Sequence, residues 1–202
     1  MKRVLNSGTI RLPQIKKDLR YLDQYVDAAV KDSNFDNLLD YQLLENWTFV
    51  FEIKAPILTF LAFQDSNLGT LKRLGEQDRQ IAYLPPYFYK KDGTTFIKLE
   101  DKQMNIYNTK LFNFFSAAFN FYNKLIEEGM CKEQAELVIP AGLFINFLWE
   151  INVRDLIMYI EDHYNDSPEI FGYCSVLMIY LEEHLPNLVR WLRARRWHDL
   201  GI

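Results

Sequence analysis

Three consecutive side chains in the C-terminal half have types that could do chemistry. Glu161, Asp162 and His163 place a histidine beside two carboxylates, a combination that is common in metal sites and in acid–base catalysis. The alternative is that these residues are charged groups at the solvent-exposed end of a helix. We favour that alternative.

A second group, residues 187–198, interleaves arginines with tryptophans near the C-terminus. Its members are Arg190, Trp191, Arg193, Arg195, Arg196 and Trp197. Arginine and tryptophan together can stack on bases or meet an anionic partner, so this segment could bind nucleic acid or protein. The alternative is that the tryptophans pack on the domain while the arginines complement a helix C-terminus.

Composition predicts one globular domain over residues 1–202. Hydrophobic residues make up 49% of the chain and aromatic residues 15%, which is enough to bury a core. The net charge of −4 gives no global attraction to nucleic acid or to an anionic membrane. No apolar run approaches the roughly 18 residues that span a bilayer, and the N-terminus lacks the pattern of a secretory signal. We therefore expect a soluble, cytoplasmic protein without a membrane partner.

The two cysteines, Cys131 and Cys174, are too few and too far apart for a disulfide framework. They also lack the CxxC spacing of zinc sites. We expect both to be small buried hydrophobic residues.

The N-terminal half mixes helical and extended patterns. Apolar residues at helical spacing predict a helix over residues 14–30 and a short helix over 39–44 that Asp36 caps. Residues 47–53 instead alternate, with Trp47, Phe49, Phe51 and Ile53 on one face, which predicts a strand that ends at 55–56. Residues 65–101 are rich in turn signals and contain short extended segments.

The C-terminal half is predicted to be helical. Apolar residues at three-and-four spacing predict a helix from about residue 108 that Gly129 ends, a short helix from 132 to 140, and a longer helix over 144–162. Asp166 or Ser167 then caps a helix that begins at Pro168 and runs to about residue 184. A last helix follows Pro186.

Two stretches resemble the flavin-dependent thymidylate synthase family. Residues 44–57 are similar to the family's Phe-Glu-His, apolar strand and Lys-Ala-Pro-Ile, with Lys54-Ala55-Pro56 in register. Residues 129–160 are similar to the segment in which Glu-Gln-Ala-Arg precedes Leu-Pro and an aromatic stretch leads into Asn-x-Arg, here Asn152 and Arg154. A trace continues at Glu169-Ile170.

The resemblance implies an α/β (α+β) fold with a central antiparallel or mixed sheet and a helical C-terminal half. It also implies a homotetramer that binds FAD and dUMP between subunits, takes a methylene group from a folate and reduces it with a flavin hydride. The phosphates of both ligands need fixed cations, which arginine supplies best because its planar donors match phosphate oxygens.

Position by position, most of these cations are missing. The family's signature Arg-His-Arg falls on Asp65-Ser66-Asn67, and a nucleotide-contacting arginine of the C-terminal half falls on Glu136. A second such arginine falls on His163, which is a cation only when protonated. An arginine-to-glutamate change at a phosphate site replaces a charge-assisted bond with a repulsive contact. The resemblance therefore implies that dUMP methylation has been lost.

Other polar residues either match the family's residues or could substitute for its missing cations. Asn152 and Arg154, which we place two apart on one helix, and Glu45 match positions that touch the flavin in the family. They are the candidate FAD-binding residues, although the loss of Arg-His-Arg makes FAD binding doubtful. The candidate substrate-binding residues are His163, Lys72, Arg73 and Arg79. The alternative for the last three is a solvated loop.

Three hypotheses follow. The first is a protein with the family's fold and assembly that has lost dUMP methylation and binds a nucleotide or a partner. The second is an enzyme with altered flavin- or folate-dependent chemistry on a pyrimidine deoxynucleotide. The third is a module that binds nucleic acid or protein through residues 187–198.

Overall fold

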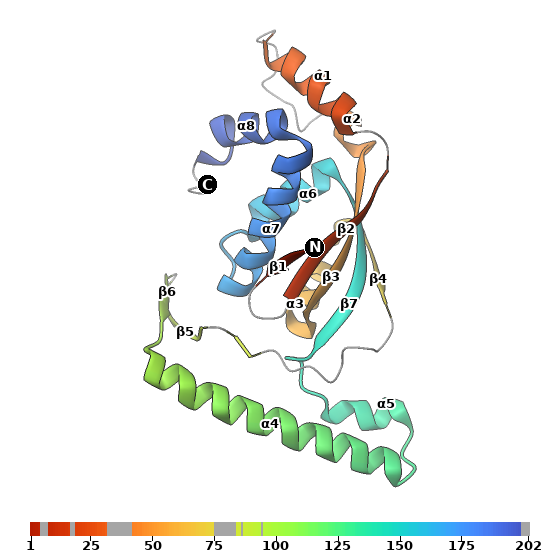
Figure 1. Cartoon of the computed structure of the whole chain (residues 1–202), viewed down its shortest axis with the longest axis vertical. Helices are drawn as coiled ribbons and strands as arrows, with labels where there is room; N and C mark the ends of the chain where they lie inside the picture. The colour runs from red at the N-terminus through yellow and green to blue at the C-terminus, as the bar shows by residue number, and fades with distance from the viewer. Residues whose placement is uncertain are drawn as a thin grey trace.

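Five antiparallel strands form the central sheet of the computed structural model, which describes residues 1–4, 8–16, 19–31, 42–74, 84–85, 87–93 and 95–198. The strand order is β1-β2-β3-β7-β4 (Figure 1). The bounds are β1 (Lys2–Val4), β2 (Gly8–Lys16), β3 (Thr48–Pro56), β4 (Thr70–Arg73) and β7 (Phe144–Asn152). A separate hairpin contains β5 (Tyr89–Asp92) and β6 (Thr95–Lys98).

The strands β3 and β7 pair along their whole lengths and form the centre of the sheet. Their register places Phe51 opposite Trp149 and Ile53 opposite Phe147, and all four side chains are fully buried. Because successive side chains of a strand point to opposite faces, the partly exposed residues between them lie on the other face. The alternation predicted for residues 47–53 is confirmed, and the strand extends to Pro56.

Helices cover the apolar face of the sheet. Figure 1 shows α6 (Val153–His163), α7 (Pro168–His184) and α8 (Pro186–Arg195) on one side of the strands. Towards the ends of this layer lie α1 (Leu19–Lys31), α2 (Gln42–Glu45) and α3 (Ile57–Asp65). The strongly apolar α7 lies at the centre of the layer and has eight buried side chains.

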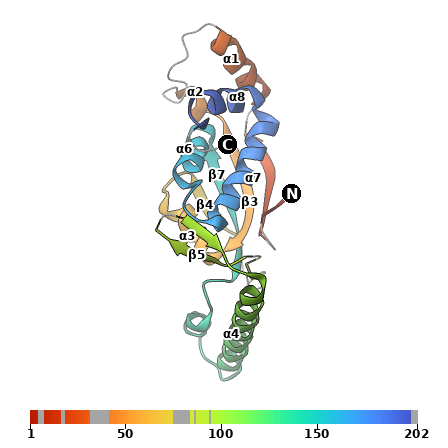
Figure 2. The same ribbon diagram turned by 90° about the vertical axis from the view of Figure 1, so that its left-hand side faces the viewer.

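The longest helix, α4 (Asp101–Glu127), lies apart from this layer (Figures 1 and 2). It is followed by the short α5 (Lys132–Ala135) and by a 3-10 turn, η2 (Glu136–Val138), which pack against it. In the part of the chain that the structure describes, no helix combines the length and apolar composition that crossing a membrane requires.

Several predicted elements are confirmed. Ser167 caps α7 by accepting a hydrogen bond from the backbone N–H of Ile170 at 3.2 Å, and Pro168 is the first helical residue. A helix follows Pro186 as expected, and Gly129 follows the end of α4 with a positive φ of 84°. The mixed α/β architecture with an antiparallel sheet and a mainly helical C-terminal half is also confirmed.

Other predicted elements are wrong. Residues 144–152 form the central strand β7 and not the first half of a helix, and residues 14–16 belong to β2 and not to a helix. The helix α4 begins at Asp101, seven residues before the expected start. Of the short helix expected over 39–44, residues 39–41 and the cap Asp36 lie outside the described residues. Apolar residues in β7 satisfy strand and helix spacing alike, and pairing with β3 decides between them.

The cysteine prediction holds for one residue and is wrong for the other. Cys131 is exposed at the start of α5, whereas Cys174 is buried in α7. Burial raises the pKa of the Cys174 thiol to about 12 because the thiolate would lose its hydration. Cys174 is therefore an unreactive core residue, and Cys131 is the accessible thiol among the described residues.

Two buried tyrosines of the core differ in their hydrogen bonding. The Tyr159 hydroxyl is fully buried without a partner, whereas the Tyr173 hydroxyl donates to the Lys54 carbonyl at 3.0 Å. Burial raises the pKa of Tyr159. An unsatisfied buried hydroxyl destabilises the folded state.

We expect Tyr159→Phe to leave the free energy of unfolding unchanged or to raise it by about 1 kcal/mol, because it removes an orphaned polar group. The matched change Tyr173→Phe should lower it by about 1 kcal/mol, because the Lys54 carbonyl loses its donor. Urea unfolding of both variants measures the difference. Equal losses in the two variants would mean that Tyr159 has a partner.

Candidate functional site

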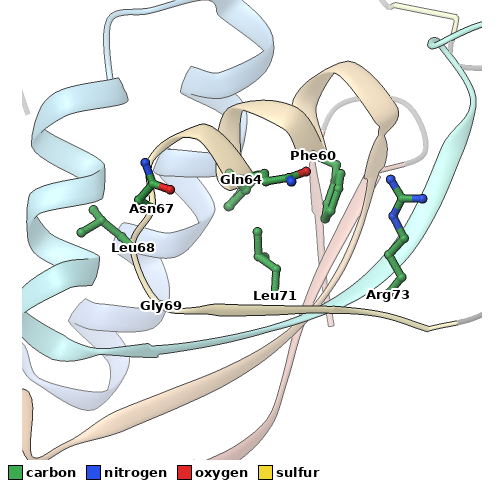
Figure 3. Close-up of a pocket in the computed structure, with 8 residues that line it drawn as sticks. Phe60, Gln64, Asn67, Leu68, Gly69, Leu71 and Arg73 are labelled. Carbon is green, nitrogen blue, oxygen red and sulfur yellow. The ribbon is translucent and has the colours of Figure 1, made fainter.

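A cavity of about 520 Å³ lies where α3 meets β4, at the position of the family's signature segment. Figure 3 shows Gln64 and Leu71 near its middle, Asn67 at one end and Arg73 at the other. Its complete lining is Phe60, Phe63, Gln64, Asn67, Leu68, Gly69, Leu71 and Arg73. The cavity therefore combines one guanidinium and two amide side chains with a floor beneath which the buried rings of Phe60 and Phe63 lie. This lining suits a polar ligand with an anionic group.

The segment Asp65-Ser66-Asn67 forms the end of α3. The Ser66 hydroxyl donates to the Phe63 carbonyl at 2.8 Å and accepts from the Leu68 N–H at 3.3 Å. Asn67 has a φ of 55°, which asparagine tolerates better than most residues, and its side-chain amide donates to the Asp65 carbonyl at 3.1 Å. The residues that replace Arg-His-Arg therefore terminate a helix, with Ser66 and Asn67 bonded to the backbone of the turn.

The turn that follows is fixed against β7. The Trp149 indole N–H donates to the Leu68 carbonyl at 3.0 Å. Gly69 has a φ of 69°, and a Cβ atom there would lie 2.5 Å from the Glu150 carbonyl oxygen. Only glycine accommodates both the positive φ and this close approach. One wall of the cavity is thus held rigidly by the central strand.

Among the described residues, Arg73 is the cation that lines the cavity. Its guanidinium lies 5.0 Å from the centroid of the Phe60 ring, within the range of a cation–π contact. Lys72 is exposed on the neighbouring position of β4 and does not line the cavity. Adjacent strand residues point to opposite faces. Of the predicted substrate-binding residues, Arg79 lies outside the described residues.

The candidate flavin residues cluster at the junction of β7, α2 and α6. Asn152 is the last residue of β7 and caps α6: its side-chain oxygen accepts from the Asp155 N–H at 2.8 Å, and its amide donates to the Asp155 carboxylate at 2.8 Å. Arg154 in the first turn of α6 forms an ion pair with Glu45 of α2. The placement of Asn152 and Arg154 on one helix is therefore wrong.

The remaining substituted positions lie elsewhere. His163 ends α6 and contacts the Asp166 carboxylate at 2.5 Å, and its ring lies 4.6 Å from that of Tyr159. Glu136 is half-buried in η2, beside α4 and α5. Neither residue lines the cavity at α3 and β4. Within one chain, the predicted substrate residues Arg73 and His163 are not brought together in one cavity.

The metal and acid–base hypothesis for Glu161, Asp162 and His163 finds no support. The Glu161 carboxylate accepts from the Arg196 guanidinium at 2.8 and 2.7 Å and from the Trp197 indole at 3.0 Å. His163 faces Asp166 instead. No group of three or more histidine, cysteine, aspartate or glutamate residues within the described ranges is arranged to hold a metal ion.

The base-stacking hypothesis for residues 187–198 is contradicted by burial. Trp191 is 8% exposed and Trp197 is fully buried, so neither ring can receive a base. Arg193 pairs with Glu182 of the preceding helix at 2.6 Å, and Arg196 pairs with Glu161. The tryptophans pack on the domain, as the alternative predicted. The arginines were predicted to complement a helix C-terminus, but Arg193 and Arg196 bind acidic side chains instead.

FAD does not fit the donor groups that the structure describes. A flavin pyrophosphate needs fixed cations, and the turn at residues 65–67 carries a carboxylate, a hydroxyl and an amide. Arg154 is paired with Glu45, and Asn152 uses its side chain to cap α6. Within one chain, the retained residues therefore support the architecture, and residues 65–67 supply no cation for a pyrophosphate.

The class of this protein is the flavin-dependent thymidylate synthases, as a match to the model of that family shows. The model of the family described as thymidylate synthase complementing protein matches residues 25–187. The chain belongs to this family, as a diverged member.

Relatives and a solved structure agree with this placement. The flavin-dependent thymidylate synthase of Thermosipho melanesiensis is 23% identical over 178 residues, covering 79% of this chain and 78% of the relative. The flavin-dependent thymidylate synthase of Borreliella burgdorferi is 21% identical over 211 residues, covering 91% of this chain and 79% of the relative. The crystal structure of the UMP/dUMP methylase PolB from Streptomyces cacaoi, bound with 5-Br UMP, shares the fold with a TM-score of 0.75. The two sequences are 16% identical, and the match covers 93% of this chain and 95% of PolB.

Sequence reasoning missed most of the cavity. Phe60, Phe63 and Gln64 line it from α3, a helix that periodicity did not predict. The available signal was the apolar run that follows Pro56, with proline just before a helix start.

Proposed function

We propose that this chain binds a nucleotide in the cavity between α3 and β4 and no longer methylates dUMP. The observation that carries the proposal is the turn at Asp65-Ser66-Asn67, where side chains bond to the backbone and supply no cation. A dianionic phosphate at this place would meet a carboxylate in the position of an arginine. Arg73 remains to meet a single anionic group.

The family supports a nucleotide as the ligand. The relatives are flavin-dependent thymidylate synthases, and the structural neighbour is a UMP/dUMP methylase. We propose a pyrimidine nucleotide for this chain, with its base near Gln64 and Leu71 and its phosphate near Arg73. From the resemblance of the sequence to the family we also propose a homotetramer, and from the composition a cytoplasmic protein that acts as a binding or regulatory subunit.

The second candidate is an enzyme with altered chemistry on a pyrimidine deoxynucleotide. The observation in its favour is that Arg73 of β4 lines the cavity and supplies a cation there. Complementation separates the two candidates: rescue of a thymidine-requiring bacterium by this gene would show that dUMP methylation persists. Flavin absorbance in the purified protein would contradict our conclusion that FAD does not fit.

The binding proposal is tested by thermal unfolding with UMP, dUMP, dTMP and FAD, because a ligand of the native state raises its stability. We expect a pyrimidine nucleotide to raise the melting temperature. Arg73→Gln should weaken that nucleotide by roughly tenfold or more, since a charged hydrogen bond contributes about 1.5–3 kcal/mol. Lys72→Gln, which removes the same charge from the adjacent position, should bind normally. Equal losses of nucleotide affinity in the two variants, or a melting temperature that no nucleotide raises, would contradict the proposal.

A further inference from the structure

The hairpin of β5 and β6 lies apart from the central sheet. Figure 1 shows it beside the start of α4, which begins at Asp101, soon after β6 ends at Lys98. The Phe88 ring contacts the Tyr107 ring of α4 at a centroid distance of 5.7 Å, and the Leu99 N–H donates to the Phe88 carbonyl at 2.9 Å. These contacts attach the base of the hairpin to α4, whereas most of the hairpin side chains are exposed.

The register of the two strands sorts the hairpin side chains into two faces, because residues directly opposite each other in an antiparallel pair point to the same face. Two pairs form the first face: Tyr89 with Lys98, and Lys91 with Phe96. Two pairs form the second face: Lys90 with Ile97, and Asp92 with Thr95. The carboxylate of Asp92 therefore lies on the face away from Lys91 and Lys98.

The first face combines aromatic rings with lysines. The Lys98 ammonium lies over the Tyr87 ring, 3.6 Å from its centroid, so Tyr87 extends this face beyond the start of β5. The Tyr89 and Phe96 rings meet edge to face at 6.5 Å, and the Lys91 ammonium lies 6.0 Å from the Phe96 centroid. We call the set of Tyr87, Tyr89, Lys91, Phe96 and Lys98 the hairpin face.

Most of the hairpin face is open to solvent. Tyr87 and Tyr89 are 41% and 37% exposed, Lys91 and Lys98 are exposed, and Phe96 is half-buried. A lysine ammonium is a point charge on a flexible stem, so it can leave a ring for a phosphate. A planar ligand can then occupy the ring surface that the ammonium vacates.

We propose that the hairpin face binds single-stranded nucleic acid. Bases stack on exposed aromatic rings while cations follow the phosphates, which is how proteins hold single strands without reading their sequence. The local charge suits this partner, because the face carries two cations and no carboxylate although the whole chain has a net charge of −4. The proposal goes beyond nucleotide binding in the cavity between α3 and β4 and does not depend on it.

Charge and size favour a nucleic acid over an apolar protein surface. An apolar partner would bury the ammonium groups of Lys91 and Lys98 without counterions, which costs free energy, whereas phosphates pair with them. A strand of four residues is about 13 Å long, which matches roughly four nucleotides at the 3.4 Å spacing of one stacked strand. The hairpin face thus suits a short stretch of single strand.

Fluorescence anisotropy with a labelled oligothymidylate of about 12 nucleotides tests the proposal. The wild-type protein should bind this probe at about 50 mM salt, and the logarithm of its affinity should fall with a slope of about −0.7 for each phosphate that a lysine meets. Tyr89→Ala should weaken binding roughly fivefold or more, because it removes one stacked base. Lys91→Gln should weaken binding by a similar factor and make the slope shallower by about 0.7.

The second face of the hairpin supplies matched controls. Lys90→Gln removes the same charge as Lys91→Gln from the adjacent position. Ile97→Ala removes an apolar side chain that is 48% exposed. Both control variants should bind the oligonucleotide as the wild type does. Circular dichroism reports whether the variants are folded, and the comparison of the two lysines decides alone if Tyr89→Ala fails to fold.

Competition and a second probe separate this surface from other sites. Excess UMP should not displace the oligonucleotide, and displacement would place the oligonucleotide in the cavity instead. No binding at low salt, or equal losses in the variants of the two faces, would overturn the proposal. Binding to phosphatidylserine vesicles that Lys91→Gln weakens, without binding to the oligonucleotide, would also overturn it, since the hairpin face would then meet a lipid surface.

Discussion

Gly69→Ala is expected to lower the free energy of unfolding by roughly 2–4 kcal/mol, because strain and overpacking act together. Gly69 has a φ of 69°, a conformation that alanine adopts only at a cost. The added Cβ would lie 2.5 Å from the Glu150 carbonyl oxygen and 3.0 Å from the Ile151 Cβ. Both belong to the central strand β7, which cannot move without disturbing its pairing with β3 and β4.

Guanidinium chloride unfolding measures the loss, and Gly93→Ala is its control. Gly93 has a φ of 59°, but nothing lies within 4 Å of an added Cβ. Conformational strain alone should cost it about 1–2 kcal/mol. Equal losses at the two glycines would show that the close approach to β7 has no energetic weight.

The same substitution should disturb the cavity. The Leu68 carbonyl receives the Trp149 indole N–H at 3.0 Å, and Gly69 follows directly. Any shift that relieves the contact with Glu150 moves this turn away from β7. We therefore expect Gly69→Ala to weaken any ligand of the cavity as well as the fold.

The sheet was predictable where one strand face is apolar and the other is not. Phe49, Phe51 and Ile53 alternate with less buried residues, and the resulting strand β3 appears as expected. In β7, Phe147, Trp149 and Ile151 also alternate, but Leu148 between them is apolar, so helix and strand spacing both fit. Only pairing with β3, about a hundred residues away in the chain, separates the two, and a local pattern does not contain it.

The helix α3 was missed for a related reason. Its residues Ile57, Leu58, Phe60, Leu61, Ala62 and Phe63 are apolar on all sides. Helices in the core of a protein lack the one-sided pattern that predicts an amphipathic helix. Three lining residues of the cavity, Phe60, Phe63 and Gln64, could therefore not be predicted.

The loss of cations in the signature segment was predictable from residue types, but the new role of that segment was not. Charge at Asp65-Ser66-Asn67 is evident in the sequence. Ser66 and Asn67 form the turn that ends α3, and the sequence did not predict the end of this helix. Likewise, Arg154 was a plausible ligand-binding residue until its partner Glu45, more than a hundred residues earlier, was placed beside it.

Phe63→Ala should lower the free energy of unfolding by roughly 3–5 kcal/mol, the range for deleting a buried aromatic ring. Phe63 is fully buried and is the centre of an aromatic cluster. Its ring stacks on Tyr159 at 4.9 Å and meets the edges of Trp149 at 4.9 Å and Phe147 at 5.5 Å. These residues come from α3, α6 and β7, so one ring joins the cavity wall to the helical layer and to the sheet.

Leu61→Ala is the control on the same helix, because Leu61 is 40% exposed and should lose less than about 1 kcal/mol. Denaturant unfolding compares the two variants. Phe63 also lines the cavity, so its removal enlarges the space available to a ligand. If the protein tolerates Phe63→Ala as well as Leu61→Ala, the cavity floor is not part of the core, because water or a neighbouring side chain must then fill the vacated volume. In that case Phe63 does not join the cavity to the sheet and the helical layer.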